Sequence, residues 1–454
     1  MNFASKKVLI IGMGKSGIAA ALVLVKKGAV VTACDIKMPE SMQETIDHLM
    51  RHKVEVMVGS YPKVKKEKYD LVVISPGVPL TIEPIQSAYN LNIPILGELE
   101  LAYQLKKLDL QMYAITGTNG KTTTTMLLQH ILTIDGVNCV AGGNIGTPLT
   151  MLVDKMDTGV ICVEASSFQL ETTSTFRPYI SSVLNITPDH LDRHKNMEAY
   201  IKAKTRIFEN QSHNDFTILN YDDPIVRDFA ALSKAQIIYF STNQVLSEGV
   251  FISEGVIMAH MKNTLTEICN VDEVSLRGKH NLENMLCATA IALVAGANPQ
   301  HIASALKSFE GVQHRMEEVR NHEGIIYIND SKATNPESAI KAIESFNQPI
   351  ILIAGGRNKG SKFDDFAQVL IEKSKALILL GESKEEIKSA VMARDYTNIH
   401  EVDNLDQAVK LAYQLAEKGD VVLLSPACAS WDMFDSYEQR GDIFCELVDS
   451  VCGV

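Results

Sequence analysis

The chain has 454 residues, of which 46% are hydrophobic and 22% charged, and its formal net charge is −12. This composition is ordinary for a globular chain and excludes a disordered tail, a collagen-like fibre and a mini-protein held by disulfide bridges. The acidic balance argues against a general nucleic-acid binder and against attachment to anionic membranes. The length allows several domains, and about three is the central expectation.

The first residues and the cysteines indicate the compartment in which the protein works. The apolar run that begins at Val8 is too short for a signal peptide, and nowhere do about 18 apolar residues follow one another. The eight cysteines are scattered and form no CxxC pair, which favours reduced, buried thiols over a zinc ribbon or a thioredoxin motif. We therefore expect a cytoplasmic protein without integral membrane association.

Short apolar runs alternate with helical patterns along the chain and predict an α/β fold of three units with mostly parallel strands. The first unit has expected strands at 8–12, 30–35, 71–75 and 93–98. The second has strands at 112–116, 138–142, 159–165, 181–186 and 216–220, then a small antiparallel insert at 250–274 and a helix near 281–295. The third has strands at 325–330, 349–356, 376–381 and 420–427. The predicted domains are 1–106, 107–311 and 312–454.

A glycine-rich loop, GMGKSG at 12–17, follows the first strand and precedes a helix, and Asp35 ends the next strand. Glycines let the backbone approach a diphosphate, and the helix N-terminus stabilises its negative charge. Taken alone, the motif makes NAD the obvious ligand, but a UDP-sugar satisfies it equally well. Tight strand–helix packing without any ligand would also account for the glycines.

A second loop, GTNGKTT at 117–123, follows the strand that ends at Thr116 and opens a helix. In such a loop the backbone N–H groups cradle phosphates, Lys121 reaches the β/γ oxygens and Thr122 or Thr123 faces Mg²⁺. The spacing departs from the usual phosphate-loop pattern because Ile115 stands where the first glycine would be. Two phosphate loops on two units indicate an ATP-driven reaction of a second phosphorylated molecule.

Polar residues follow further strands of the predicted sheets. Glu164 ends a strand of the second unit, where a Mg²⁺ ligand is expected. His190 follows another strand beside two aspartates, which leaves a metal or phosphate role and a structural role equally open. The charged helix that carries Lys204 is expected to expose that lysine to solvent. In the third unit, polar clusters would either suit a carboxylate-bearing substrate or cap helices, at 311–317, 329–335, 355–360 and 425–432.

Together these strings resemble the Mur ligases of bacterial cell-wall synthesis over essentially the whole chain. GTNGKTT is shared with folylpolyglutamate synthases, whereas ASSFQLE, NDSKATN, and SPACAS followed by EQRG are typical of the members that add D-glutamate. The resemblance implies a Rossmann-like N-terminal domain that binds UDP, a central P-loop ATPase domain and a Rossmann-like C-terminal domain. It thereby assigns the first glycine loop to UDP rather than to NAD.

The same resemblance implies the residues of the site. It assigns catalysis to Lys121, Glu164, His190 and Lys204. It assigns two Mg²⁺ sites to Thr122, Glu164, His190 and Lys204, with Lys204 carbamylated. It assigns ATP binding to Gly117, Thr118, Asn119, Gly120, Lys121, Thr122, Thr123, Asn281, Arg315 and Asp330. It assigns the UDP substrate to Gly14, Lys15, Ser16, Asp35, Ile36, Lys37, Ser75, Gly77 and Asn144. It assigns D-glutamate to Lys332, Thr334, Lys359, Ser430 and Tyr437.

The implied reaction is the ATP-dependent addition of D-glutamate to UDP-N-acetylmuramoyl-L-alanine in peptidoglycan precursor synthesis, through an acyl phosphate and with release of ADP and phosphate. The expected partners are these small molecules, and the expected state is a monomer. The chain departs from the family pattern in two places, since Ile36-Lys37 replaces a frequent Thr-Arg and Tyr437 replaces a frequent Phe. The alternatives are a sister ligase or folylpolyglutamate-synthase-like ligase with another amino acid, a nicotinamide oxidoreductase and a nucleotide-controlled switch.

Overall fold

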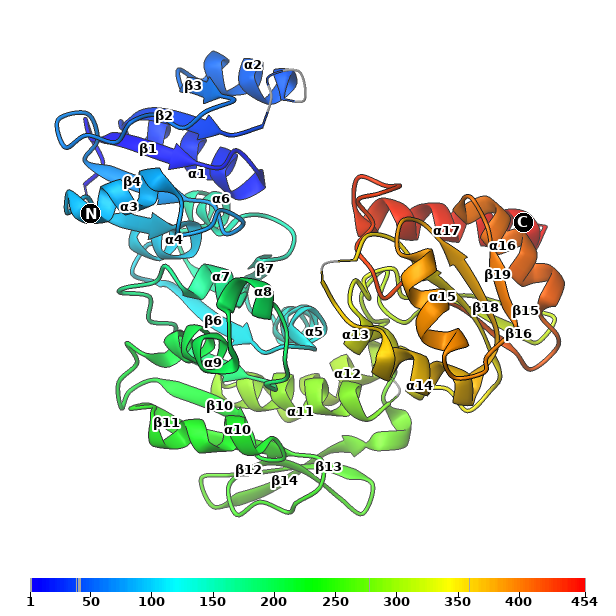
Figure 1. The fold of residues 1–454 in the computed structure, drawn as a ribbon. Coiled ribbons are helices and arrows are strands. Elements are labelled where there is room, and N and C mark those ends of the chain that lie inside the picture. The colour runs from blue at the N-terminus through cyan, green and yellow to red at the C-terminus, as the bar shows by residue number, and fades with distance from the viewer. Residues whose placement is uncertain (1, 38, 40–41, 277, 359, 454) are drawn as a thin grey trace. The chain divides into compact units, whose positions relative to one another are not determined.

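The computed structural model describes residues 2–37, 39, 42–276, 278–358 and 360–453. It contains three sheets with helices packed against them, as Figure 1 shows. The chain divides into two compact units, residues 1–309 with the first two sheets and residues 310–454 with the third. No helix in the described part of the chain is long and apolar enough to cross a membrane.

The first sheet has five parallel strands in the order β3-β2-β1-β4-β5. The strands are β1 (Lys7–Ile11), β2 (Val30–Asp35), β3 (Glu55–Val58), β4 (Leu71–Ile74) and β5 (Ile95–Gly97). The helices are α1 (Lys15–Lys26), α2 (Gln43–Arg51), α3 (Glu83–Asn90) and α4 (Glu98–Leu105). The strand order reverses between β1 and β4, so the crevice that binds ligands in such sheets lies beyond the carboxyl ends of these two strands.

The second sheet has nine strands in the order β14-β13-β12-β11-β10-β9-β6-β8-β7. Its strands are β6 (Leu110–Thr116), β7 (Cys139–Gly143), β8 (Gly159–Glu164), β9 (Ile180–Val183), β10 (Phe216–Asn220), β11 (Gln236–Ser241), β12 (Gly249–Ser253), β13 (Val256–Met261) and β14 (Thr264–Asn270). Its helices are α5 (Lys121–Ile134), α6 (Leu149–Lys155), α7 (Ser167–Leu170), α8 (Leu191–His194), α9 (Met197–Thr205), α10 (Pro224–Asp228), α11 (Lys279–Val294) and α12 (Pro299–Ser308). The antiparallel pairing of β12, β13 and β14 confirms the predicted insert.

The third sheet has six strands in the order β15-β16-β20-β17-β18-β19, and only β15 is antiparallel to its neighbour. The strands are β15 (Glu317–His322), β16 (Ile325–Asn329), β17 (Ile350–Gly355), β18 (Ser374–Leu380), β19 (Ile399–Glu401) and β20 (Val421–Leu424). The helices α13 (Pro336–Glu344), α14 (Asp364–Lys373) and α15 (Lys384–Met392) cover one face, and α16 (Leu405–Leu415) and α17 (Tyr437–Val451) cover the other. Burial on both faces explains the unbroken apolar runs of β17, β18 and β20.

Two buried carboxylates of α4 join the first sheet's domain to the second. Glu100 is 0% exposed and accepts hydrogen bonds from the N–H groups of Ser174, Thr175 and Phe176 and from the Thr175 hydroxyl. Glu98 is 1% exposed and accepts bonds from the N–H and hydroxyl of Thr150. These bonds hold residues 1–309 as one compact body.

The two carboxylates titrate in opposite directions. Burial alone would raise the pKa of Glu100, but the hydrogen bonds from Thr175 and Ser174 outweigh it and lower the pKa. Burial raises the pKa of Glu98 to about 7, and the bonds from Thr150 only reduce this rise. Glu100 therefore stabilises the joint as a carboxylate, whereas burial disfavours the charged form of Glu98.

Glu100→Gln is expected to lower the free energy of unfolding by about 2–4 kcal/mol at neutral pH, because it places an amide donor against backbone N–H groups. The folded-state pKa of Glu100 lies below its unfolded value. Its contribution is therefore complete above the unfolded pKa and is lost as the pH falls through the folded pKa. Urea unfolding at neutral pH and near pH 4 should show the difference from wild type shrinking in acid.

Glu98→Gln is the matched control, since it keeps an acceptor for Thr150 and removes a carboxylate that burial disfavours. We expect it to destabilise the protein far less than Glu100→Gln above neutral pH. Equal losses for the two variants would contradict the assigned roles.

Candidate functional site

The first glycine loop lies at the crevice of the first sheet. Gly12 has φ +92°, and a Cβ at Gly17 would lie 1.9 Å from the Gly12 carbonyl oxygen, so both positions require glycine. Nothing lies within 4 Å of a Cβ built at Gly14, which precedes α1 and leaves the helix N-terminus open toward a ligand. This geometry suits a diphosphate.

The other predicted UDP contacts, apart from Asn144, gather around this loop. Asp35 ends β2 and accepts hydrogen bonds from the N–H groups of Met13 and Lys37, at 2.8 and 3.1 Å. The Ser75 hydroxyl follows β4 and donates to the Gly12 carbonyl, at 2.8 Å. The structure thus brings together the predicted residues Gly14, Lys15, Ser16, Asp35, Ile36, Lys37, Ser75 and Gly77 at the carboxyl ends of β1, β2 and β4.

The second loop connects β6 to α5 in the middle of the second sheet. Gly117 and Gly120 have positive φ angles of +153° and +82°, and a Cβ at Gly120 would lie 2.1 Å from Asn284 Oδ1. Asn185, which follows the neighbouring strand β9, accepts the N–H of Asn119 at 2.8 Å. The N–H of Thr118 donates to the Asn185 carbonyl at 3.0 Å. Asn185 therefore fixes the start of the loop, whose glycine-rich backbone suits a phosphate cradle.

Near the start of α5, two polar side chains donate hydrogen bonds to the carboxylate of Glu164. The Thr122 hydroxyl donates to Glu164 Oε2 at 2.7 Å, and Asn144 Nδ2 donates to Glu164 Oε1 at 2.8 Å. Glu164 ends β8, the neighbour of β6, and is 2% exposed. Asn144 thus lies beside the predicted Mg²⁺ ligand Glu164.

Lys204 is buried, so the expectation that it is exposed to solvent is wrong. It is 1% exposed, and its amine donates to the Gly117 carbonyl at 2.6 Å and lies 4.8 Å from the centre of the Tyr200 ring. Burial, together with the nearby Lys121 cation, lowers the pKa of Lys204 well below its usual value, although Asp189 and Glu164 oppose the change. The charged pattern of α9 did not indicate that Lys204 is buried, because the burial results from packing of this helix against the loop after β6.

His190 lies at the start of α8, with φ +53°, and its side chain is 38% exposed. Its Nε2 is 3.4 Å from Asp189 Oδ2, and its ring lies 4.7 Å from the Phe168 ring. Because β9, β6 and β8 are adjacent, His190, Lys121 and Glu164 all come from loops at the carboxyl edge of one sheet.

The donors in this region fit Mg²⁺ bound together with a phosphate. Glu164 and Thr122 supply a carboxylate and a hydroxyl oxygen, and Mg²⁺ in enzymes commonly takes one or two carboxylates plus phosphate and water oxygens. Across the described ranges, no group of three or more His, Cys, Asp and Glu side chains could hold a metal ion.

The helix α11 closes one side of the phosphate loop. Asn284 accepts a bond from the Thr124 hydroxyl at 3.2 Å and donates to Asn281 Oδ1 at 3.4 Å. Both asparagines are buried. Asn281 was predicted from the family resemblance, whereas Asn284 was missed, although it lies one helical turn further on the same face.

In the compact unit of residues 310–454, the predicted nucleotide contacts Arg315 and Asp330 lie near the end of β16. Burial raises the pKa of Asp330 to about 7, while the Arg315 cation and the hydrogen bond from the Ser425 hydroxyl, at 2.8 Å, partly offset this rise. Asp330 also accepts a bond from the N–H of Met316 at 3.3 Å.

The predicted D-glutamate contacts follow β16 and β20, which are adjacent. The Lys332 amine lies 5.1 Å from the centre of the Tyr437 ring, and the N–H of Thr334 donates to the Lys332 carbonyl. Ser430 is 1% exposed, and its hydroxyl has no hydrogen-bond partner among the described residues. Lys359, the remaining predicted contact, lies outside the residues that the structure describes.

Arg440 is a site residue that sequence reasoning missed, although the EQRG string contains it. It is 3% exposed and donates to the Ser331 hydroxyl and carbonyl and to the Cys428 carbonyl, at 2.9, 2.7 and 3.3 Å. The Ser331 hydroxyl in turn donates to the Tyr437 carbonyl at 2.8 Å. Arg440 thus ties together the loops that carry Lys332, Ser430 and Tyr437.

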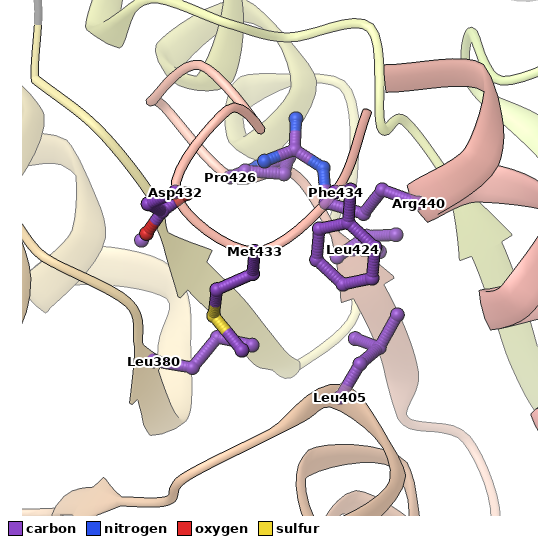
Figure 2. A pocket seen from close by; sticks show the side chains of 10 residues that line it. Leu380, Leu405, Leu424, Pro426, Asp432, Met433, Phe434 and Arg440 are labelled. Atoms are coloured by element: carbon purple, nitrogen blue, oxygen red, sulfur yellow. The ribbon is translucent and has the colours of Figure 1, made fainter. Parts of the chain in front are cut away.

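A small cavity lies behind these loops, and Figure 2 shows Phe434, Leu405 and Leu424 on its apolar side and Arg440 on its polar side. Its volume of about 10 Å³ holds at most about one water molecule. The cavity is therefore a packing defect beneath the loops and is too small for an amino acid.

Three family models match the chain in succession. The model for the Mur ligase MurD-like N-terminal domain matches residues 6–97, that for the Mur ligase middle domain 115–292, and that for the Mur ligase glutamate ligase domain 314–428. Each match contains one of the three sheets, apart from the first residues of β6.

Full-length relatives carry the name UDP-N-acetylmuramoylalanine–D-glutamate ligase. The protein from Pelotomaculum thermopropionicum is 50% identical over 451 residues, which cover 99% of both chains. The protein from Clostridioides difficile is 43% identical over 453 residues, which cover 99% of this chain and 100% of that one.

Solved structures share the fold at low sequence identity. UDP-N-acetylmuramate-alanine ligase from Thermotoga maritima is 19% identical, with a TM-score of 0.60 over 98% of this chain and 100% of that one. MurF ligase from the same organism, in complex with ADP, is 16% identical, with a TM-score of 0.61 over 99% and 96% of the two chains. At these identities the likeness concerns the fold alone.

Gly120→Ala is expected to weaken ATP binding by about 1–3 kcal/mol, because the added Cβ meets Asn284 Oδ1 and the backbone conformation is strained. Gly136→Ala is the matched control, since Gly136 also has φ +82° but nothing lies within 4 Å of its Cβ. Calorimetric titration with ATP and Mg²⁺ should show a loss for Gly120→Ala alone. Equal affinities of the two variants would show that the loop does not hold the nucleotide.

Proposed function

Because this chain belongs to the Mur ligase family, we propose that it joins D-glutamate to UDP-N-acetylmuramoyl-L-alanine with ATP, releasing ADP and phosphate. It is an ATP-dependent acid–amino-acid ligase of peptidoglycan synthesis. The full-length match to relatives that bear this activity in their names carries the proposal. Its substrates are small molecules, and we place its work in the cytoplasm as a monomer.

The residues of the phosphate loop suit the activation of a carboxylate. A carboxylate is a poor acyl donor, so the γ-phosphate of ATP is first transferred to the alanyl carboxylate, which gives an acyl phosphate. Lys121 neutralises charge on the transferred phosphate, and the open loop of β6 aligns it. When bound, Mg²⁺ at Thr122, Glu164, His190 and Lys204 supplies further positive charge to the phosphate oxygens.

A carbamylated Lys204 would complete the oxygen ligands. A free ammonium there would repel a metal ion, whereas a carbamate presents an anionic oxygen. Carbamylation requires the neutral amine, and the lowered pKa of Lys204 favours that form. Its burial at 1% exposure also protects a carbamate from exchange with water.

The unit of residues 310–454 supplies the contacts for D-glutamate. The two carboxylates of D-glutamate require cations and short donors, which Lys332, Thr334 and Ser430 provide. The Tyr437 ring borders the same loops. The buried, unpartnered hydroxyl of Ser430 supports a ligand at this position, because buried polar atoms in native proteins normally find a partner. Arg315 and Asp330 would contact the nucleotide.

We expect the enzyme to use D-glutamate, the amino acid that the names of the relatives give. With ATP, Mg²⁺ and UDP-N-acetylmuramoyl-L-alanine, phosphate release should require D-glutamate within a panel that includes L-glutamate, L-lysine and diaminopimelate. The nucleotide product should be ADP, because a phosphate-loop lysine addresses the β/γ oxygens. Stoichiometric AMP and pyrophosphate, or comparable kcat/KM with another amino acid, would refute the proposed reaction.

Lys204→Ala should be nearly inactive and should regain part of its activity with added acetate or formate, which can place a carboxylate oxygen in the vacated space. Lys202→Ala is the matched control, because Lys202 lies on the same helix and is exposed. Initial rates of phosphate release with and without carboxylate measure both variants. Full activity of Lys204→Ala without any additive would exclude a carbamate at this position.

A further inference from the structure

One guanidinium joins the loop after β4 to the loop that carries His190. Arg193, on α8, donates to the Pro76 carbonyl at 2.8 Å and to the Val78 carbonyl at 3.3 Å. The same group forms an ion pair with Glu171 at 3.2 Å. Its side chain is 19% exposed, so water screens these bonds only partly.

On the side of the first sheet, Arg193 contacts the loop at 75–78, and this loop supports the first glycine loop. The Val78 N–H donates to the Ser75 carbonyl at 3.0 Å, and the Ser75 hydroxyl donates to the Gly12 carbonyl. A Cβ at Gly12 would lie 2.8 Å from a methyl of Val78, which shows how tightly the two loops pack. Arg193 therefore binds the loop at 75–78, which packs against the glycine loop that is expected to hold the UDP group.

On the side of the second sheet, Arg193 is fixed by an aromatic ring. Its guanidinium carbon lies 4.2 Å from the centre of the Phe168 ring, which is also 4.7 Å from the His190 ring and 5.4 Å from the His194 ring. Phe168 belongs to α7, which follows Glu164 on β8. The ring thus connects Arg193 to His190, which is a predicted metal ligand.

We propose that Arg193 is a positioning residue that couples binding of the UDP group to the placement of the reacting carboxylate. It does not touch the reacting atoms. It fixes the separation between the loops at 12–17 and 75–78 and the segment that carries His190. This inference rests on the proposed function, since it supposes that one substrate spans both places.

The physical reason is that binding energy from a remote part of a substrate accelerates a reaction only when the reacting atoms are held in register. A guanidinium can donate to two carbonyl oxygens and a carboxylate at once, because its donors form a rigid fork. A shift of about 1 Å between anchor and reaction centre is enough to cost a large part of the rate. UDP binding can therefore lower the barrier only through a stiff connection such as Arg193.

The test compares UDP-N-acetylmuramoyl-L-alanine with the truncated substrate N-acetylmuramoyl-L-alanine 1-phosphate. In wild type, the ratio of their kcat/KM values measures how much the uridylyl group contributes to the transition state. In Arg193→Met this ratio should fall about tenfold or more, mainly through kcat of the full substrate. Losses that are additive, with an unchanged ratio, would overturn the inference.

Two further variants separate positioning from stability. Arg193→Lys keeps a cation near Phe168 and Glu171 but cannot form the fork, so its ratio should also fall while its Tm stays near that of wild type. Lys26→Met is the matched control, because Lys26 forms a different bridge between the same domains, to Asp154 at 2.6 Å. A ratio restored to the wild-type value in Arg193→Lys, or an equal fall in Lys26→Met, would contradict a positioning role.

A measurement without turnover distinguishes failure of this inference from failure of the proposed reaction. Hydrogen exchange with and without UDP should show protection of residues 75–78 in wild type and in Arg193→Met. Protection of residues 188–195 should occur in wild type and be lost in the variant. Protection of 188–195 that is absent in wild type, or retained in the variant, would reject the coupling whichever amino acid the enzyme uses.

Discussion

Two lysine amines converge on one carbonyl oxygen, and the rest of the site depends on this contact. Lys121 and Lys204 both donate to the Gly117 carbonyl, at 2.9 and 2.6 Å. Burial is the main reason why the pKa of Lys204 is lowered, and the charge of the nearby Lys121 lowers it further. The phosphate loop thus carries Lys121, and a buried amine with a lowered pKa lies against the same carbonyl.

The fold reaches this arrangement by placing loops from three neighbouring strands side by side. His190 follows β9, Lys121 and Thr122 follow β6, and Glu164 ends β8. The helix α9 brings Lys204 against the loop after β6. Parallel strands direct all such loops to one edge of the sheet. Within residues 1–309, Glu98, Glu100 and Arg193 join the first two sheets, so the loops of both belong to one compact body.

Much of this could be predicted from the sequence, because local signals coincide with the sheet edges. The glycine loops, the strand that ends at Glu164 and the antiparallel insert are all confirmed as elements. The polar edge strand β15 lacks an apolar run and was missed, since it buries little on one side. The burial of Lys204 was also missed, because it is decided by tertiary packing that a helix pattern does not encode.

In residues 310–454, a buried side chain holds the loops that carry the candidate contacts. Arg440 is buried and binds only backbone and hydroxyl oxygens of the loops that carry Lys332 and Ser430. Burial lowers its pKa to about 10, which still leaves it charged at neutral pH, so the hydrogen bonds to it are stronger than those between neutral groups. A buried charge at this place holds the loop at 331 and the loop at 428 together, because a carbonyl oxygen of each loop accepts a hydrogen bond from one rigid guanidinium. A loop that is already ordered loses less conformational entropy when a ligand binds to it.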